Sequence, residues 1–566
     1  MKTDTDILVI GAGPSGLLLS NLLAKYGCRV TLVERAPELI DYPRAIGIDD
    51  ESLRSMQSAG LAEQVSAHIS PRHAIRVLNG KGRVISEMDP TTEEYGWSRR
   101  NGFVQPLVDK VMYEGLERFE DVRVLMGHEV TDLEETTDGV TAQISVAGTD
   151  KTLSISAEYV VGCEGGRSMT RNWMGVDFEG VSTGTRWLVV DIDNDPLGTP
   201  NAIFGADPRR PHGSFGLPHG IRRWEFMLHD DEPDSVVDNN NFIFGLLSKH
   251  TAHPHTLDIA RRRVFTHHGR IAGQFRKGRV LLAGDAAHLM PTWAGQGWNS
   301  CIRDATNLSW KLAAVVHGTA ADSLLDTYDQ ERRNHAAAMV ALSLNMGKVF
   351  GTTNRAVAGF RDALALGLNI MPKAKKYVTD MRWKPMPRYE TGVVVDAAST
   401  QSGRSTGKMP TTLSRSLVSK VASSGVGVQF PQPRVSTSTQ ARVRLDDAIG
   451  SGWNVLVWGN DPHQMFSEDS HALLEQLGAS LIRIVPEVRR EWTEEHSDTR
   501  TTVVGDVDGS LKAWFDDRPF SVVFLRPDKF VAAVSLTGDA DNVLAAVLSS
   551  MSFRGKVVAA QITAST

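Results

Sequence analysis

The sequence predicts an α/β fold that combines a parallel nucleotide-binding sheet, an inserted β-rich region and a separate C-terminal α/β domain. Three observations predict it. The chain begins with an apolar run, a glycine-rich turn, an apolar helix-like stretch and a second apolar run. Residues 121–165 and 185–230 alternate apolar and polar side chains, which is typical of strands. A Ser-, Thr- and Gly-rich stretch at 397–441 precedes a final segment in which short apolar runs alternate with helical ones.

The composition is that of an ordinary globular protein. The 566 residues are 41% hydrophobic and 23% charged, which excludes a disordered chain or a coiled coil. The length suggests about two or three domains. Lys and Arg total 61 against 67 for Asp and Glu, so no basic excess points to nucleic acid or to an anionic membrane. No apolar run approaches the roughly 18 residues of a membrane span.

The cysteine pattern favours a reducing compartment. Cys28, Cys163 and Cys301 lie far apart and form no CxxC pair. We therefore expect neither a disulfide framework nor a zinc site, and no metal at all. The N-terminal residues lack the apolar core of a signal peptide, so the expected location is the cytoplasm.

The first chemical motif is the glycine-rich turn GAGPSG at residues 11–16, which follows the strand expected at 5–10. Gly11 permits the tight turn, Gly13 lets the backbone approach a pyrophosphate, and Gly16 lets the next helix pack on the sheet. The N-terminus of that helix offers free N–H groups to the phosphates. The motif therefore predicts a dinucleotide site in a Rossmann-like unit.

Glu34 ends the second expected strand, residues 29–34. A carboxylate at this place accepts hydrogen bonds from the ribose hydroxyls of a dinucleotide. The motif does not choose between NAD and FAD, and a glycine-rich turn without a ligand is the structural alternative.

A second motif decides for a flavin. The expected strand at 279–284 ends before Asp285, and a Pro- and Gly-rich turn leads to a helix that begins near Asn299. Asp285 can bind a ribityl hydroxyl. The backbone N–H groups at 295–297 can face the edge of the flavin that becomes anionic on reduction.

The segment GDAAHLMPTWAGQGWN at 284–299 resembles the second FAD motif of the class A flavoprotein aromatic hydroxylases, the family of para-hydroxybenzoate and phenol hydroxylases. The resemblance covers nearly the whole chain. It is strongest to the branch that hydroxylates hydroxyphenylpropionates, in residues 41–61, 324–336 and 381–389. Residues 511–533 resemble that branch's thioredoxin-like domain, which here has no cysteine, so packing or dimerisation is its expected role.

The resemblance implies the reaction. The protein is expected to use FAD, NADH or NADPH and O2 to hydroxylate a phenolic acid ortho to its hydroxyl group, through a flavin C4a-hydroperoxide. The implied conversion is 3-(3-hydroxyphenyl)propionate to 3-(2,3-dihydroxyphenyl)propionate, a step of aromatic catabolism. A tailoring hydroxylase of a larger polycyclic aromatic, a flavin-binding protein with little turnover and an NAD-dependent dehydrogenase remain alternatives. A homodimer is expected by analogy.

The resemblance also implies site residues. Arg44 reaches the FAD pyrophosphate, Gln105 and Asp285 lie along the ribityl chain, the carbonyl of Pro291 lies over the reactive face of the flavin, and Asn299 opens the helix beside it. The remaining expected cofactor contacts are Gly11, Gly13, Ser15, Gly16, Glu34, Arg35, Glu164, Gly295, Gln296, Gly297 and Trp298.

Two residues depart from the family pattern. Glu164, in CEGGRS at 163–168, replaces the usual aspartate, which puts cofactor affinity in question. Cys301 stands where close relatives usually have glycine and could narrow the site.

The base that activates the phenol and the group that binds the carboxylate are harder to find. Candidates for the base are Asp49, His212, His219 and Tyr42, and the expected catalytic set is Pro291, Asp49 and His219. Arg222 and Arg223 are the expected carboxylate ligands, and strand alternation places them on opposite faces.

The expected domain boundaries follow from these features. They are a first FAD-binding part at 1–180, a substrate-binding β-sheet region at 181–270, a second FAD-binding and helical part at 271–395, a linker-like segment at 396–441 and the thioredoxin-like domain at 442–566.

Overall fold

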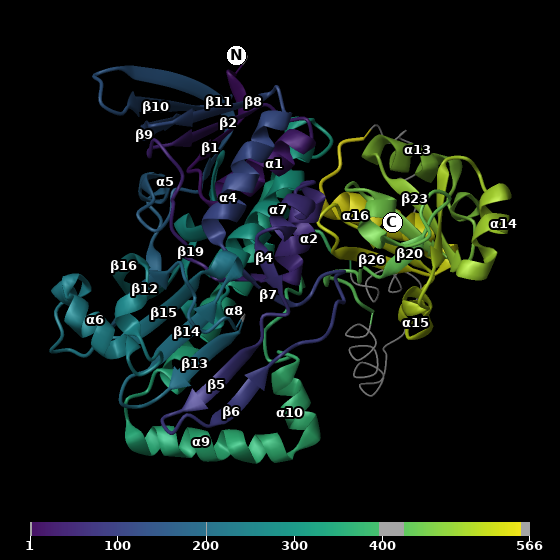
Figure 1. The fold of residues 1–566 in the computed structure, drawn as a ribbon. Coiled ribbons are helices and arrows are strands. Elements are labelled where there is room, and N and C mark those ends of the chain that lie inside the picture. Colours follow the sequence, from purple (N-terminus) through teal and green to yellow (C-terminus); the bar gives the residue numbers. More distant parts are fainter. Residues whose placement is uncertain (1–2, 200, 396–423, 556–566) are drawn as a thin grey trace, which may run out of the picture. The chain divides into compact units, whose positions relative to one another are not determined.

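The computed structural model describes residues 3–199, 201–395 and 424–555. They form two compact units. Unit 1 comprises residues 1–93, 97–306 and 333–385, and unit 2 comprises 94–96, 307–332 and 386–566. The α/β prediction is confirmed, and Figure 1 shows the elements of both units.

The first sheet of unit 1 is the expected nucleotide-binding sheet. Its strand order is β17-β18-β11-β1-β2-β8, and β1 pairs in parallel with both β11 and β2. The six residues of β1 are all buried, as expected for a strand of a parallel sheet that is covered on both faces. The strands are β1 (Thr5–Ile10), β2 (Val30–Glu34), β8 (Val122–Met126), β11 (Thr152–Gly162), β17 (Arg276–Lys277) and β18 (Val280–Leu282).

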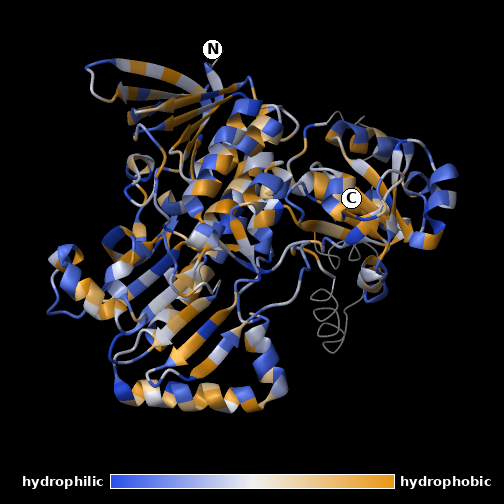
Figure 2. Ribbon diagram, in the orientation of Figure 1, coloured by the Kyte–Doolittle hydropathy of each residue, from blue (hydrophilic) through white to orange (hydrophobic). Residues whose placement is uncertain are grey.

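A hairpin extends this sheet. The strand β10 (Val140–Val146) pairs antiparallel with β11, and β9 (His128–Glu135) pairs antiparallel with β10. Their alternating apolar and polar residues are visible as stripes in Figure 2. The helix α1 (Pro14–Lys25) packs on β1 and β2 and against α4 (Gln105–Glu114). The other helices of this part are α2 (Asp50–Ser58), α3 (Ala62–Ser66), α5 (Met169–Met174) and the first half of α7 (Gly297–Val316), whose residues from 307 on belong to unit 2.

The second sheet of unit 1 is the inserted β-rich region, with strand order β19-β16-β12-β15-β14-β13-β5-β6. The helix α6 (Asn240–Leu247) covers one face, where Trp224 and Phe226 of β15 are buried. Arg223, Glu225 and Met227 alternate with these residues and therefore point to the opposite face. The strands are β5 (Ile75–Asn79), β6 (Val84–Met88), β12 (Phe178–Ile192), β13 (Ala202–Ala206), β14 (His212–Gly216), β15 (Arg222–Met227), β16 (Ile259–Ala272) and β19 (His288–Leu289).

This sheet extends beyond the expected range of 181–270. It takes β5 and β6 from the N-terminal part of the chain and β19 from the second FAD motif. The helices α9 (Arg355–Ile370) and α10 (Pro372–Thr379) pack against β6. A small third sheet joins β3 (Gly47–Asp49), β7 (Arg100–Phe103) and β4 (Ile69–Pro71).

Unit 2 contains a seven-stranded sheet of order β21-β20-β24-β23-β22-β25-β26. Within it, β22 and β23 are parallel whereas β25 and β26 are antiparallel, which agrees with the thioredoxin-like expectation. The strands are β20 (Arg434–Ser436), β21 (Val443–Arg444), β22 (Asn454–Trp458), β23 (Ser480–Pro486), β24 (Thr501–Asp506), β25 (Val522–Leu525) and β26 (Val531–Ser535). The helices are α12 (Leu445–Ile449), α13 (Glu468–Leu477), α14 (Arg490–Glu495), α15 (Ser510–Asp516) and α16 (Ala540–Ser550), and α8 (Asp326–Phe350) runs through both units.

Part of the expected linker, 396–441, belongs to the core of unit 2. Residues 396–423 lie outside the described residues. The rest of the predicted segment includes β20, and Val426, Phe430 and Val435 are buried in the core of unit 2. The composition of the segment is dominated by Ser and Gly, so its few buried apolar residues did not predict a place in a core.

The described residues contain no helix long and apolar enough to cross a membrane. In the same residues, no cluster of His, Cys, Asp or Glu is arranged to hold a metal ion. Cys28, Cys163 and Cys301 are buried, and none of these three described cysteines forms a disulfide bond.

Candidate active site

A cavity of about 1200 Å³ lies in unit 1. It is lined by the glycine-rich turn, by the end of β2, by the loops at 44–47 and 163–167, by the 285–301 segment and by one face of the second sheet. Ligand pockets of about 300–1,000 Å³ hold a single small molecule, so this cavity has room for a dinucleotide and an aromatic ligand together.

The three motif glycines have different tasks. A Cβ atom on Gly11 would lie 2.7 Å from the carbonyl oxygen of Cys163, and one on Gly16 would lie 2.0 Å from that of Gly11. These two positions are therefore closed by the packing of the turn. A Cβ atom on Gly13 would meet nothing within 4 Å, and Gly13 lines the cavity. The opening at Gly13 fits the close approach of a pyrophosphate.

Glu34 and Gln105 shape the backbone at this end of the cavity. The carboxylate of Glu34 accepts hydrogen bonds from the N–H groups of Ala12 (2.8 Å) and Ala36 (2.9 Å). The Oε1 atom of Gln105 accepts bonds from the N–H groups of Arg44 (3.0 Å) and Ala45 (2.8 Å). Gln105 thus holds the loop that carries Arg44 into the cavity. Ser15, Glu34, Arg35, Arg44 and Gln105 all line it.

Glu164, which stands in place of the usual aspartate, is hydrogen-bonded within its loop. Its Oε1 atom accepts bonds from the hydroxyl group of Ser168 (2.8 Å) and the N–H group of Thr170 (2.7 Å), at the start of α5. The additional methylene lets the carboxylate reach this helix while Glu164 still lines the cavity.

The second motif closes the other side of the cofactor region. Asp285 lines the cavity, and burial raises its pKa. The thiol of Cys301 lies 3.8 Å from the Oδ1 atom of Asp285, and Cys301 is buried and lines the cavity. Gly295, Gly297 and Trp298, at the start of α7, line it as well.

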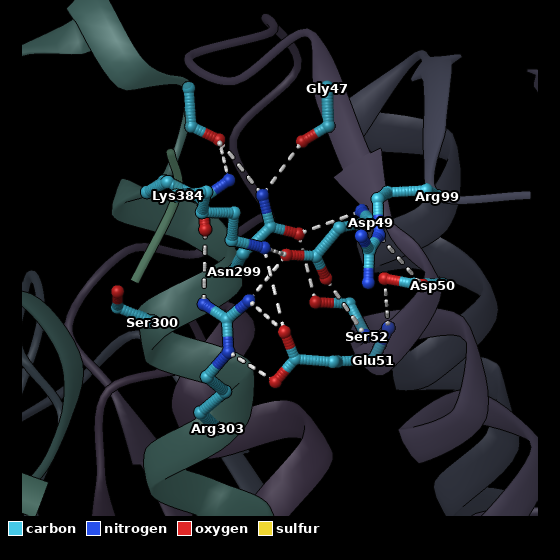
Figure 3. A network of polar contacts seen from close by, with 12 residues as sticks. Gly47, Asp49, Asp50, Glu51, Ser52, Arg99, Asn299, Ser300, Arg303 and Lys384 are labelled. Atoms are coloured by element: carbon cyan, nitrogen blue, oxygen red, sulfur yellow. Dashed lines mark hydrogen bonds and ion pairs between the residues drawn. The ribbon is translucent and has the colours of Figure 1, made fainter. Parts of the chain in front are cut away.

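Four expected contacts do not line the cavity: Gly16, Pro291, Gln296 and Asn299. Asn299 instead positions its neighbours (Figure 3). Its Oδ1 atom accepts bonds from the N–H group of Asp49 (3.0 Å) and the hydroxyl group of Ser52 (2.8 Å), and its Nδ2 atom donates to the carbonyls of Gly47 (3.1 Å) and Gly295 (2.9 Å).

Asp49 is part of a buried ion network next to Asn299, shown in Figure 3. Its carboxylate pairs with Arg303 and, at 2.7 Å, with Lys384, while Arg303 also pairs with Glu51 at 2.9 Å. Arg303 and Lys384 hold the pKa of the Asp49 carboxyl below its ordinary value despite burial. Asp49 does not line the cavity, so this position suits a structural ion better than a base.

The other expected catalytic and substrate residues also have partners of their own. His219 lies outside the cavity, with its Nε2 atom 3.1 Å from Nδ1 of His68. Arg222 donates to Asp195 at 2.6 and 3.0 Å. Arg223 points to the opposite face, as alternation predicted, and binds Asp191 at 2.7 and 3.0 Å.

Tyr42 and His212, the other candidate bases, also stand outside the large cavity. The hydroxyl group of Tyr42 accepts a bond from Arg263 (2.8 Å), and the ring of His212 lies 4.6 Å from that of His250 in a tilted arrangement. Tyr42 and Arg223 line an adjoining cavity of about 250 Å³.

Arg100 is a site residue that sequence reasoning missed. It is only 8% exposed and lines the cavity. Its Nε atom donates to the carbonyl of His73 (3.0 Å), and its other two nitrogens have no partner among the described residues. Cβ atoms on Gly47 and Gly295 would lie 3.3 and 3.7 Å from its Nη1 atom. In the sequence WSRRNGF, nothing distinguishes it from the adjacent arginine.

Aromatic and apolar side chains line the part of the cavity nearest the second sheet. Phe204 and Trp293 have ring centroids 5.2 Å apart, and Phe204 lies 6.2 Å from Phe215. The other members of this aromatic chamber are Ile75, Val77, Met88, Met346, Phe350, Met381 and Trp383. A flat aromatic ligand fits such walls.

Residues 4–343 match the family model described as FAD binding domain, and residues 427–550 match the HcaD C-terminal domain. The chain belongs to the FAD binding domain family. This assignment overturns the NAD-dependent dehydrogenase that the first motif had left open. The cavity is consistent with this family, since four residues expected to contact FAD line it together: Gly13, Glu34, Arg44 and Asp285.

Curated relatives cover almost the whole chain. One from Mycobacterium avium (strain 104) is 49% identical over 97% of this chain and 92% of its own. One from Comamonas testosteroni is 45% identical over 94% of this chain and 95% of its own. Both are named 3-(3-hydroxy-phenyl)propionate/3-hydroxycinnamic acid hydroxylase. This chain is accordingly an FAD-dependent aromatic hydroxylase.

Solved structures share the fold. The flavin-dependent monooxygenase PieE, in complex with FAD and substrate, has a TM-score of 0.78 at 19% identity and covers 97% of this chain and 100% of its own. Aklavinone-11 hydroxylase, with FAD and aklavinone, has a TM-score of 0.75 at 22% identity over 98% and 99%.

Proposed function

We propose that this hydroxylase acts on 3-(3-hydroxyphenyl)propionate and its hydroxycinnamic analogue and places the new hydroxyl group ortho to the existing one. One oxygen atom of O2 enters the ring, the other leaves as water, and NADH or NADPH supplies two electrons. The names of the curated relatives support this substrate. FAD supplies the chemistry that couples oxidation of the nicotinamide to activation of O2.

The main support for the proposal is the buried guanidinium of Arg100, which lines the cavity. Its guanidinium is buried in the wall of the cavity that includes the aromatic chamber, and two of its nitrogens have no hydrogen-bond partner among the described residues, although the charge of Asp49 acts on it. A buried guanidinium requires an anion, and its two terminal nitrogens match the two oxygens of a carboxylate. Burial lowers the pKa of Arg100 to about 10, so it stays charged at neutral pH. A phenolic acid supplies both the anion and the ring.

The chain's own residues position the reactants. Gly13, Glu34 and Arg44 would hold the dinucleotide, and the N–H groups at the start of α7, which line the same cavity, would stabilise negative charge on the reduced cofactor. The aromatic chamber holds the substrate ring and excludes water, which strengthens the electrostatic interactions inside.

The test compares wild type with Arg100→Gln. Purified wild type should oxidise NADH or NADPH faster with 3-(3-hydroxyphenyl)propionate and release a product heavier by one oxygen atom. Arg100→Gln should raise KM for this acid by roughly 100-fold, since a buried charge pair is lost. KM for the neutral amide of the substrate should change little. An exposed control, Arg76→Gln, should alter neither value.

The second candidate is a tailoring hydroxylase of a larger aromatic, which the cavity volume and the bound aklavinone of a structural relative favour. A neutral polycyclic substrate would not use Arg100. Turnover of such a compound, with no stimulation by the phenolic acid, would contradict the proposal.

We also propose that the enzyme is a homodimer of the cytoplasm. The helix α9 exposes apolar residues, with Phe360 at 73% and Ile370 at 82% exposure, and a second copy could cover them. Light scattering should give twice the mass of the chain, and Phe360→Ser should shift the protein to monomers. Fractionation of cells should place the enzyme in the cytoplasm.

A further inference from the structure

Glu225 is a buried acidic residue in the face of the second sheet that borders the cavity. It stands in the middle of β15 and is only 8% exposed. Trp224 and Phe226 point into the core beneath α6, so the carboxylate of Glu225 points the other way. Glu225 lines both the large cavity and the adjoining small one.

The carboxylate of Glu225 has no strong partner of its own. It accepts no hydrogen bond within the described part of the chain, and its nearest cation is Arg223, with Nη1 3.9 Å from Oε1. That guanidinium is already committed to Asp191 at 2.7 and 3.0 Å. A buried carboxylate without hydrogen bonds is costly, so such a group indicates a ligand that would bind it.

The surroundings of Glu225 fit a phenol ring. Glu225 pairs with Gly213 of β14 and with Val189 of β12. A Cβ atom on Gly213 would lie 2.5 Å from the ring of Phe215, so that ring covers the glycine beside Glu225. Phe215 lines the aromatic chamber. The carboxylate therefore stands at the wall of the chamber, next to an aromatic side chain.

Glu225 and Arg100 lie toward different ends of β14. Arg100 donates to the carbonyl of His73, whose Nε2 atom is 2.8 Å from the carbonyl oxygen of Gly216. Glu225 pairs with Gly213, three residues away along the strand, which corresponds to about 10 Å. A ring with a three-carbon acid chain can extend between two such groups.

We propose that Glu225 is the base that takes the proton from the substrate's phenol group; this inference rests on the proposed function. The phenolic O–H bond breaks, its electron pair stays on the oxygen, and the proton moves to the Glu225 carboxylate. The phenolate releases electron density to the ortho carbon, which forms a C–O bond to one oxygen atom of activated O2 as the O–O bond breaks. Loss of the ring proton from that carbon then restores the aromatic ring, and the other oxygen atom leaves as water. The proton returns to solvent or to product before the next turnover.

The protonation behaviour of Glu225 suits this role. Burial raises its pKa to about 7, Arg223 lowers it and Asp191 raises it. A base with a pKa near the working pH transfers protons efficiently in both directions. The charged or titratable groups that face Glu225 or share its small cavity are Arg44, Asp191, Arg223, Arg261, Arg263, His267, His268 and Asp285.

The test uses Glu225→Gln in the FAD-loaded enzyme, a variant that keeps the size and removes the base. Its kcat for hydroxylated product should fall by about 100-fold. Oxidation of NADH or NADPH should continue and release hydrogen peroxide instead of product. A ring-fluorinated substrate has a more acidic phenol and needs less help from a base. With it, the kcat of Glu225→Gln should be at least about tenfold closer to the wild-type value.

A difference spectrum gives a second readout. The phenol bound to wild type should ionise at a lower pH than the free compound, and in Glu225→Gln this shift should disappear. Glu179→Gln, which removes an exposed carboxylate from β12, should behave as wild type. A merely structural role of Glu225 would depress turnover of both substrates equally and would leave the ionisation of the bound phenol unchanged.

Each outcome of these experiments supports or overturns either the proposed function or the assignment of Glu225. If wild type makes no product from 3-(3-hydroxyphenyl)propionate, the proposed function fails, and the comparison is repeated with whichever phenol stimulates NADH or NADPH oxidation. Wild-type kcat and coupling in Glu225→Gln would overturn the assignment. If that variant loses FAD, the pH profile of wild type is measured instead. Its kcat for the parent phenol should fall below pH of about 7, whereas its kcat for the fluorinated phenol should not. A flat profile for the parent phenol would overturn the proposal.

Discussion

Replacing Arg303 by methionine tests the buried ion network of Figure 3. Arg303 donates to Glu51 at 2.9 and 3.0 Å and pairs with Asp49, and all three side chains are no more than 6% exposed. Without the guanidinium, Lys384 still pairs with Asp49 at 2.7 Å, but Glu51 keeps only a 3.5 Å contact with it. The Glu51 carboxylate then remains buried without a cation in close contact.

The expected cost follows from this geometry. Removing one partner of a buried ion pair costs about 3–5 kcal/mol. Unit 1 has about 350 residues, which at about 2.1 cal/mol/K per residue gives about 0.7 kcal/mol for each degree. The thermal midpoint of unit 1 should therefore fall by about 4–7 °C.

The release of FAD on heating, followed by its fluorescence, reports this midpoint, since the cofactor cavity lies in unit 1. The matched control is Arg76→Met, which breaks an ion pair with Glu87 in which both side chains are more than 40% exposed. Such a pair contributes at most about 1 kcal/mol. If both variants shift the midpoint equally, the network does not stabilise the fold in the way argued here.

Three further variants probe other parts of the molecule. Gly13→Ala should fold normally, because its Cβ meets nothing within 4 Å, but should weaken FAD binding by roughly 100-fold in a flavin titration; unchanged affinity would place the pyrophosphate elsewhere. Burial raises the pKa of Asp109 to about 7, so the stability of wild type should fall as pH rises from about 4 to about 7. Asp109→Asn should therefore have a higher melting temperature than wild type at pH of about 8 and the same one at pH of about 4. In unit 2, Glu331 accepts bonds from Arg526 (2.8 Å) and Lys311 (2.7 Å), so Glu331→Gln should cost about 3–5 kcal/mol in denaturant unfolding followed by near-UV circular dichroism, and a cost below about 1 kcal/mol would contradict this.

The chemical type of the cofactor site could be predicted because its signals are local. The turn at 11–16 needs glycines at fixed spacing, and the packing distances at Gly11 and Gly16 confirm why. Asp285, Gly295, Gly297 and Trp298 also line the cavity as expected. These residues act through backbone geometry within a few positions of each other, which sequence spacing records directly.

The residues that we propose to meet the substrate could not be predicted in the same way. Arg100 and Glu225 stand on strands of different sheets, and nothing in WSRRNGF or RRWEFML marks them. Arg222 and Arg223 were the expected carboxylate ligands, yet each has an aspartate partner, Asp195 and Asp191, that is distant in sequence. Whether a charged side chain is free or paired depends on such distant partners.

The sequence by itself determined the fold class, the dinucleotide turn and the flavin motif, because hydrophobic periodicity and glycine spacing act over short stretches of chain. The tertiary structure alone decided that β5 and β6 join the second sheet, that Asp49 pairs with Arg303 and Lys384 in a buried network, and that Arg100 and Glu225 line the cavity. The physical reason is desolvation. A charge is stabilised or left without a partner by whatever the fold brings within about 4 Å of it, and that set of neighbours does not exist until the chain has folded.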